Sequence, residues 1–324
     1  MKMPTYDKTV LARKAQELGF NRDAYEKMSR LTEILRFIGN DGELGALLAL
    51  KGGTAINLTV LNLPRLSVDI DMDFSENLTR EETKLRRGRI NELLSRYMAA
   101  EGYAPKSKSK QTHALDSFVY SYTNAAGNAD NIKVEINYSL RCHTLPTVLA
   151  AVNASGAFAD FSVRTLSPIE VFAGKIVALL GRGAARDLYD LNNMVCFGLF
   201  DEPDLTLLRK CAVLYRAVAG DAKTNGFDFT KLDDITGRMI RTDLHPVIRH
   251  TERFDFAAAK SRVSEFLTEL MTLTDKERTF LVRFAEGHYE PELLSFDADI
   301  LARIADHPMA TWRIARIRRE QQEK

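Results

Sequence analysis

The sequence predicts an α+β fold, with a mixed β-sheet core and flanking helices followed by an all-α C-terminal region. Three observations support this prediction. Apolar and acidic residues alternate over residues 66–74, and two further segments of strand periodicity flank a glycine-containing turn near residue 127. Helical periodicity dominates from residue 166 onward. We expect two domains, residues 1–165 for the sheet core with N-terminal helices and residues 166–324 for the helical region.

Composition and charge exclude several classes of protein. The chain has 324 residues and a net charge of +1, so binding to nucleic acid would need a local basic patch. Its three cysteines show no CxxC spacing, which favours reduced thiols in a cytosolic protein. No run of about 18 apolar residues occurs, so we expect a cytoplasmic protein without membrane contact.

The N-terminal third is predicted to combine helices with a strand. Residues 7–39 carry apolar side chains at helical spacing and should form two helices. The run "LGALLALKGGTAINL" is either helical or a buried apolar segment, interrupted at Gly52-Gly53. In residues 66–74, Leu, Val, Ile and Met alternate with Ser and Asp, and this period of two is typical of a strand.

The later elements follow from capping and turn chemistry. Thr79 and Glu82 have the spacing of a capping box, so a helix should run from there to near Gly102. Residues 118–139 have the pattern of a β-hairpin around the turn "NAAGNAD". Pro168 should open a helix that ends at Gly181–Gly183, with the next helix beginning near Ala185. From about residue 203 the chain should be helical, with loops near 220–227 and 286–296.

Three aspartates share one face of the predicted strand at residues 66–74. Asp69, Asp71 and Asp73 lie about 6–7 Å apart along it, and like charges at this spacing repel. Either this face is solvated, or Asp69 and Asp71 hold a divalent cation such as Mg²⁺ or Mn²⁺ through their oxygen atoms. Glu135, on the polar face of the second hairpin strand, could supply a third carboxylate and permit two ions. Asp73, at the strand end, is expected to be a helix-entry or solvent residue.

The segment Gly52-Gly53-Thr54 precedes this strand and offers a second functional feature. A glycine pair at a helix start lets backbone N–H groups approach phosphates without interference from a Cβ atom. The alternative is a glycine pair that merely ends a helix. Because no GxxxxGK[ST] motif occurs, the phosphates of a nucleotide would not be held as in a P-loop.

Several motifs in the same order resemble a known family. The glycine turn followed by a D-x-D strand is similar to the nucleotidyltransferase superfamily. "LKGGTAINL", "RLSVDIDMDF", "IKVEINY", "LSPIEVFAGKIVALLGRGAARDLYDL" and "LTDKERTFLVRFAEGHYEPELL" resemble the AbiEii toxin family of MenT-like nucleotidyltransferases. The resemblance extends from about Leu47 to Trp312.

The resemblance implies a metal-dependent transfer of a nucleoside monophosphate from an NTP, with Mg²⁺ or Mn²⁺ as cofactor. It implies an RNA acceptor such as the 3′ end of tRNA, a toxin-antitoxin or abortive-infection role, and a cognate antitoxin protein. Residue by residue, it assigns the phosphate turn to Gly52, Gly53 and Thr54, and the metal to Asp69 and Asp71. The spacer between turn and strand is longer than in compact superfamily members, and a loop at "LNLP" would absorb it.

The resemblance also assigns roles in the helical region. Lys175 matches the lysine of a motif that begins at Glu170, and Asp187 and Asp190 belong to "RDLYDL". Lys175 would either reach solvent from an apolar helix or enter the cleft and neutralise phosphate charge. The two aspartates would either cap a helix with an internal ion pair to Arg186, or Asp187 would position Lys175 while Arg186 contacts the nucleotide. Arg65 and Arg182 are further candidates for phosphate contacts.

The acceptor is left open by the residues themselves. Residues 79–111 contain nine basic and four acidic side chains, which would suit an RNA backbone or form a solvated helix and loop. Three hypotheses follow: a toxin that modifies RNA, a nucleotidyltransferase acting on a small molecule or a protein hydroxyl, and a non-catalytic binding module on the same fold. The intact glycine pair, aspartates and lysine argue against the third.

Overall fold

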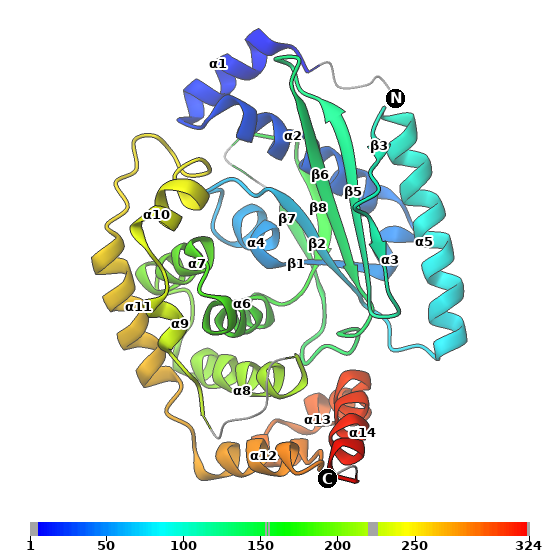
Figure 1. The fold of residues 1–324 in the computed structure, drawn as a ribbon, viewed down its shortest axis with the longest axis vertical. Coiled ribbons are helices and arrows are strands. Elements are labelled where there is room, and N and C mark those ends of the chain that lie inside the picture. Colours follow the sequence, from blue (N-terminus) through cyan, green and yellow to red (C-terminus); the bar gives the residue numbers. More distant parts are fainter. Residues whose placement is uncertain (1–5, 153, 155, 220–225, 323–324) are drawn as a thin grey trace. The chain divides into compact units, whose positions relative to one another are not determined.

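The computed structural model describes residues 6–152, 154, 156–219 and 226–322, and it divides the chain into two compact units (Figure 1). The first comprises Met1–Arg141, Thr147–Thr165 and His245–Glu252, and the second comprises Cys142–Pro146, Leu166–Leu244 and Arg253–Lys324. Each unit is described by itself.

One mixed sheet forms the core of the first unit. In the part of the chain that the structure describes, its eight strands have the order β3-β5-β6-β2-β1-β8-β7, with β4 paired to β5. The strands are β1 Leu48–Lys51, β2 Asp69–Phe74, β3 Ala104–Pro105, β4 Lys110–Gln111, β5 Leu115–Thr123, β6 Ala129–Asn137, β7 Val148–Val152 and β8 Phe161–Thr165.

The carboxylate strand β2 lies in the interior of this sheet. It runs antiparallel to β1, with Lys51 opposite Asp71, and parallel to β6, with Asp71 opposite Glu135. Because successive side chains on a strand point to opposite faces, the odd-numbered residues of β1, β2 and β6 share one face. Lysine and acidic side chains from three neighbouring strands therefore gather on a single face of the sheet.

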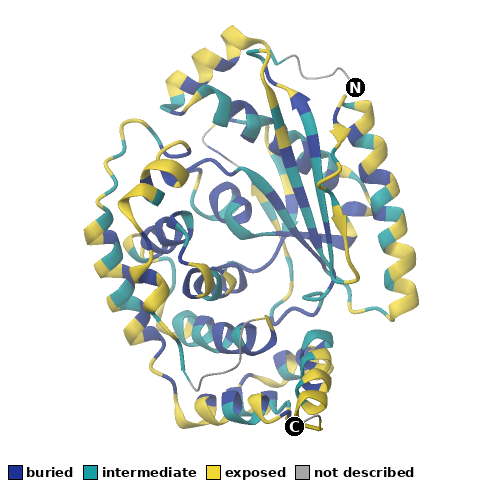
Figure 2. Ribbon diagram, in the orientation of Figure 1, coloured by how far each residue is buried: buried dark blue, intermediate teal, exposed yellow. Residues whose placement is uncertain are grey.

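Helices cover the opposite face. The first unit contains α1 Lys8–Leu18, α2 Arg22–Asn40, α3 Leu44–Leu47, α4 Gly52–Ala55, the π-helix η1 Ile56–Val60 and α5 Arg80–Ala100. The rings of Phe37 on α2 and Tyr97 on α5 stack with centroids 3.9 Å apart. Arg87 of α5 donates to buried Asp116, which pairs in register with Ile136 on the even-numbered face of β6. In the interior strands β2 and β6, the side chains of Ile70, Met72, Ile132, Val134 and Ile136 are buried. The inner side of α5 is more buried than its outer side (Figure 2).

The described residues of the second unit form helices joined by loops. It contains α6 Pro168–Arg182, α7 Ala185–Cys196, α8 Glu202–Ala219, α9 Thr230–Asp233, α10 Gly237–Met239, η2 Ile240–Leu244, α11 Phe256–Leu270, α12 Asp275–Ala285, η3 Pro291–Leu294, α13 Ala298–Ile304 and α14 Pro308–Gln322. Pro168 occupies the first turn of α6. Gly183 ends it with φ +59°, and an added Cβ there would lie 2.4 Å from the Lys231 carbonyl oxygen. Only glycine fits this junction between α6 and α7.

The predicted α+β fold with a helical C-terminal region is confirmed. The two N-terminal helices, the capping box of α5, the hairpin β5–β6 and the break between α6 and α7 all occur where the sequence predicts them. Strands β1, β3, β4, β7 and β8 were not predicted, and β2 begins at Asp69, three residues later than its alternating pattern. Of the loop predicted near 220–227, residues 220–225 lie outside the described residues.

Two short segments belong to a different unit from their sequence neighbours. Val247 and Ile248 join the first unit because Leu66 N–H donates to the Val247 carbonyl at 2.8 Å and Arg65 forms a β-bridge with Ile248. The segment Cys142–Pro146 joins the second unit because its backbone N–H groups bind Glu170 of α6. Among the helices that the structure describes, none is long and apolar enough to span a membrane.

Candidate functional site

The glycine turn lies directly against the carboxylate strand. Gly52 follows β1 and starts α4 with φ +67°, a left-handed conformation that glycine adopts without strain. A Cβ atom added to Gly52 would lie 2.9 Å from Oδ2 of Asp71. Because Gly52 has no side chain, the Asp71 carboxylate can lie close against the backbone of the turn.

The second glycine lies under an arginine. A Cβ on Gly53 would lie 2.6 Å from Nη2 of Arg65, whose Nη1 donates to the Leu66 carbonyl at 3.0 Å. Asn57 links the same groups, because its Nδ2 donates to the Gly53 carbonyl at 2.6 Å and its Oδ1 accepts from the Arg65 backbone at 3.4 Å. The turn therefore has a buried guanidinium fixed beside it.

The long spacer between turn and strand is absorbed locally. Residues 56–60 form the π-helix η1, and Asn62 and Leu63 have φ of 51° and 59°. The Leu63 N–H donates to the Asn57 carbonyl at 2.7 Å. The predicted loop at "LNLP" thus brings the chain back, and the turn and Asp71 stay adjacent despite the added residues.

Thr54 ties the turn to β2. Its hydroxyl is 1% exposed and donates to the Asp69 carbonyl at 2.5 Å, while Ser67 Oγ lies 2.6 Å from it and acts as donor. Because the hydroxyl is used inside the protein, a contact between Thr54 and a phosphate would have to come from its backbone N–H.

The three aspartates of β2 differ in environment. Asp69 and Asp71 are half-buried, whereas Asp73 is only 2% exposed and pairs with Lys51 Nζ at 2.5 Å. The expectation that Asp73 is a helix-entry or solvent residue is therefore wrong, because Asp73 is buried and the neighbouring strand β1 provides it with a half-buried lysine as partner. The remaining pair, Asp69 and Asp71, lies next to the glycine turn.

Glu135 lies on the same face but is already paired. Lys133, opposite Asp69 on β6, places its Nζ 2.7 Å from Oε2 of Glu135. Partial burial lowers the pKa of Lys133, but the bond to Glu135 and the charges of Asp69 and Asp71 outweigh it and raise the pKa above its usual value. Within the described ranges, no three His, Cys, Asp or Glu side chains come close enough to hold a metal ion together. The assignment of Glu135 as a third ligand stays a prediction.

The helical motif forms a buried ion-pair cluster in the second unit. Lys175 of α6 is 6% exposed, and its Nζ lies 2.8 Å from Oδ1 of Asp187 and 3.0 Å from Oδ2 of Asp190 on α7. The lysine therefore does not extend along the helix surface into solvent. Both aspartates of the motif contact the Lys175 ammonium, and the functional roles predicted for these residues stay predictions.

A second cation helps to hold Asp187 ionised. Arg182 donates from Nε to Oδ2 of Asp187 at 2.7 Å and from Nη2 to Oδ1 at 3.0 Å. Burial raises the pKa of Asp187, but the charges and hydrogen bonds of Lys175 and Arg182 dominate and lower it to about 2. Arg182, and not the half-buried Arg186, is the arginine that binds this aspartate.

Glu170, at the start of the same motif, has a structural position. It is 1% exposed and accepts from the backbone N–H groups of Thr144 at 2.6 Å and Leu145 at 3.2 Å, and from the Tyr215 hydroxyl. Burial raises the pKa of Glu170 above its usual value. This carboxyl group joins α6 to α8 and to the segment 142–146, and so fixes the helix that carries Lys175.

The predicted basic segment is only partly available for a ligand. Arg87 is engaged with Asp116 and lies over the Tyr138 ring, and Arg89 bonds to Glu43. Exposed basic side chains remain on α5 and around β4: Arg80, Lys84, Arg86, Arg96, Lys108 and Lys110. Those on α5 lie on the helix that covers the sheet face opposite to the carboxylates.

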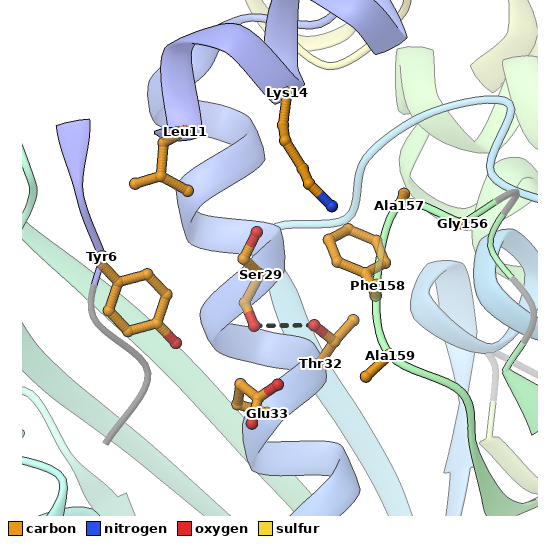
Figure 3. A pocket seen from close by; sticks show the side chains of 10 residues that line it. All are labelled: Tyr6, Leu11, Lys14, Ser29, Thr32, Glu33, Gly156, Ala157, Phe158 and Ala159. Carbon is orange, nitrogen blue, oxygen red and sulfur yellow. Dashed lines mark hydrogen bonds between the residues drawn. The ribbon is translucent and has the colours of Figure 1, made fainter. Parts of the chain in front are cut away.

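A pocket of about 410 Å³ lies elsewhere in the first unit (Figure 3). It is lined by α1 and α2 and by the segment 156–159. Lys14 and Phe158 approach each other across it, and the Ser29 and Glu33 side chains come from α2. None of the predicted functional residues lines this pocket, so its location gives no support to the predicted site.

The residues of the sheet face are suited to a divalent cation and a phosphate chain. Two carboxylates at alternate positions supply hard oxygen ligands, and the backbone of Gly52 lies close to one of them. Lys175 and its aspartates belong to the other unit. Their predicted contribution to a common cleft stays a prediction.

A mixed sheet with a glycine turn beside a carboxylate pair, followed by a helical region, defines the chain as a nucleotidyltransferase. The family model for "Nucleotidyl transferase AbiEii toxin, Type IV TA system" matches residues 36–286, and the chain belongs to this family. The structure is similar to that of MenT4, a nucleotidyltransferase toxin from Mycobacterium tuberculosis H37Rv. The similarity covers 93% of this chain and 98% of MenT4, with a TM-score of 0.63 and 19% identity. No curated protein sequence matches the chain significantly.

The sequence did not assign Lys51 or Lys133 to the site, and it indicated Arg182 only as a candidate for phosphate contacts. Lys51 and Lys133 become part of the carboxylate face only through strand pairing, and Arg182 reaches Asp187 across the turn between two helices. Period-two alternation already places Lys133 on the face of Glu135, so this lysine was recognisable as a neighbour of the predicted ligand. Lys51 was not, because β1 was not predicted.

Proposed function

We propose that the protein transfers a nucleoside monophosphate from an NTP to RNA, in a reaction that depends on Mg²⁺ or Mn²⁺. The observation that carries this proposal is the contact between the Gly52 turn and the Asp71 carboxylate, 2.9 Å from the position of an added Cβ. A phosphate group bound to the turn would lie beside the carboxylates, as phosphoryl transfer requires.

In this proposal, Asp69 and Asp71 hold the metal ion, which when bound neutralises phosphate charge and orients the triphosphate. The backbone N–H groups of Gly52, Gly53 and Thr54 bind phosphate oxygens, because no Cβ on the glycines blocks their approach. Arg65, fixed by the Leu66 carbonyl, adds a positive charge next to Gly53. These groups would bind and align the nucleotide, and alignment provides much of the acceleration in phosphoryl transfer.

The helical cluster would supply a further cation. Asp187 fixes the Lys175 ammonium in position, and Lys175 and Arg182 lower the pKa of Asp187. A cation held in this way can stabilise the charge that develops on the transferred phosphate without reorganising during the reaction. In this proposal Arg186, half-buried on α7, contacts the nucleotide.

The acceptor proposed is RNA, with the 3′ end of tRNA as its specific form. Support comes from the exposed lysines around β4, Lys108 and Lys110, which could contact a phosphate backbone. As a member of a type IV toxin–antitoxin family, the chain is expected to have a cognate antitoxin that relieves its toxicity.

Incubation of the purified protein with each α-labelled NTP and total RNA, with and without Mg²⁺ or Mn²⁺, tests the proposal. Label should enter RNase-sensitive material only with metal, and Asp71→Asn should abolish its transfer. Asp130→Asn is the matched control, because Asp130 lies on the other face of β6 and pairs with Lys27. Label in protein or a small molecule instead would favour the alternative acceptor, and no metal-dependent transfer to any acceptor would refute the proposal.

A further inference from the structure

Lys133 lies on the carboxylate face of the sheet, next to the acidic side chains. It lies on β6, opposite Asp69 in the register with β2, and Glu135 lies opposite Asp71. Its ammonium is 2.7 Å from Oε2 of Glu135. One lysine therefore shares a sheet face with all three carboxylates that the sequence offers as metal ligands.

The ammonium lies on an interior part of the sheet. β6 is between β5 and β2, and the Lys133 side chain is 37% exposed. Its contact with Glu135 places a positive charge among the carboxylates of this face.

This arrangement distinguishes Glu135 on β6 from Asp69 and Asp71 on β2. Glu135 is bonded to Lys133, and in the described part of the chain no three potential ligands are grouped closely enough to hold a metal. A second divalent ion between Asp71 and Glu135 would lie close to the Lys133 ammonium on Glu135, and the like charges of the two cations would repel each other.

We propose that Lys133 takes the place of a second metal ion, so that this nucleotidyltransferase binds a single divalent cation at Asp69 and Asp71. Glu135 then acts as the partner that positions the lysine and does not ligate the metal. This inference rests on the proposed function, because it concerns the same metal site. The lysine would provide a fixed positive charge close to the phosphates in every catalytic cycle, whatever the concentration of metal.

A simple structural salt bridge is the alternative explanation. Lys133 and Glu135 are two residues apart on one strand, and such a pair can merely stabilise a partly solvated sheet face. Counting bound metal ions separates the two explanations, since a purely structural pair would not control the number of metal ions.

The experiment measures the number of Mn²⁺ ions bound per protein, from the electron paramagnetic resonance signal of free Mn²⁺ during a titration without nucleotide. The wild type should bind one ion. Lys133→Met should bind two, because the loss of the ammonium releases Glu135 to hold a second ion with Asp71. Lys133→Gln should also bind two, which keeps the test valid if the methionine variant fails to fold. Lys133→Arg, which retains the charge, should bind one.

Two further variants serve as controls. Lys27→Met removes another ion-paired lysine, whose partner Asp130 lies on the opposite face of β6, and should leave one ion bound. Lys133→Met with Glu135→Gln should return the count from two to one, because the second ion loses its ligand.

Two ions in the wild type would overturn the inference, as would a single ion in both uncharged Lys133 variants or a second ion that survives Glu135→Gln. In each case the metal dependence of the proposed function would stand. No bound Mn²⁺ in any of these proteins would instead refute the metal site itself, and the inference with it.

Discussion

Replacing Lys175 by methionine would leave two acidic side chains inside the second unit without the cation that joins them. Asp187 is 1% and Asp190 0% exposed, and both carboxylates lie within 3.0 Å of the Lys175 ammonium. Removing one partner of a buried ion pair costs about 3–5 kcal/mol, because the remaining charge stays desolvated. Arg182 still bonds to Asp187 after the change, so we expect a loss near the lower end, about 3 kcal/mol.

The chain contains a convenient probe for this measurement. Its single tryptophan, Trp312, lies on α14 of the second unit, so its fluorescence follows the unfolding of the unit that carries the mutation. Urea titrations of the wild type and Lys175→Met should show the free energy of unfolding falling by this amount. Adding Asp190→Asn should restore part of the loss, because one of the two buried charges is then removed.

Lys231→Met is the matched control. Lys231 lies in the same unit and pairs with Asp234, but their side chains are 47% and 60% exposed. An exposed pair of this kind contributes little to stability, because solvent screens the two charges. If Lys175→Met lowered the free energy of unfolding no more than Lys231→Met, the ion-pair cluster would not be strongly coupled. It would then not hold Lys175 in position.

Further predictions concern acid stability and the glycine turn. Because the pKa of Asp187 falls from 3.8 to about 2 on folding, its stabilisation of about 2 kcal/mol is complete above pH 3.8 and is lost as the pH falls toward 2. The difference in unfolding free energy between wild type and Asp187→Asn should therefore shrink over that range in urea titrations. Gly52→Ala should weaken NTP binding in calorimetry, since its φ of +67° costs an alanine roughly 1–2 kcal/mol and its Cβ would lie 2.9 Å from Asp71. Gly88→Ala, where nothing lies within 4 Å, should leave binding unchanged. Thr54→Val should lower labelled-NMP transfer and reduce stability by about 1–3 kcal/mol, whereas Thr54→Ser should preserve both, because it keeps the hydroxyl that bonds to β2. A pH-independent difference for Asp187→Asn would contradict the first explanation. Equal NTP binding by Gly52→Ala and Gly88→Ala would contradict the second, and equal transfer and stability of Thr54→Val and Thr54→Ser would contradict the third.

Patterns of neighbouring residues correctly predicted the strands, helix starts and helix ends that depend on those residues alone. The alternation in β2 and β6, the capping box at Thr79 and the glycine at the end of α6 are recorded in adjacent residues, and each element occurs as expected. Leu48–Lys51 has three apolar residues followed by a lysine, a pattern that suits a helix or a strand equally well. Pairing with β2 makes this segment a strand. The pattern within the run could not reveal that partner.

The same distinction explains which site residues were predicted. The proximity of Gly52 to Asp71 depends on the course of residues 56–68, and spacing alone left it undetermined. Asp73 was assigned to solvent because the sequence does not show that Lys51 is its neighbour across the sheet. Strand register, which is a long-range property, thus decides that Asp73 pairs with Lys51 and that Lys133 lies opposite Asp69.

The most direct test of the central claim is a crystal structure of the protein with Mn²⁺ and a non-hydrolysable NTP analogue. The metal should lie between the carboxylates of Asp69 and Asp71, with the triphosphate on the backbone N–H groups of Gly52 and Gly53. A nucleotide bound elsewhere, with the two carboxylates in contact with neither metal nor phosphate, would contradict the account.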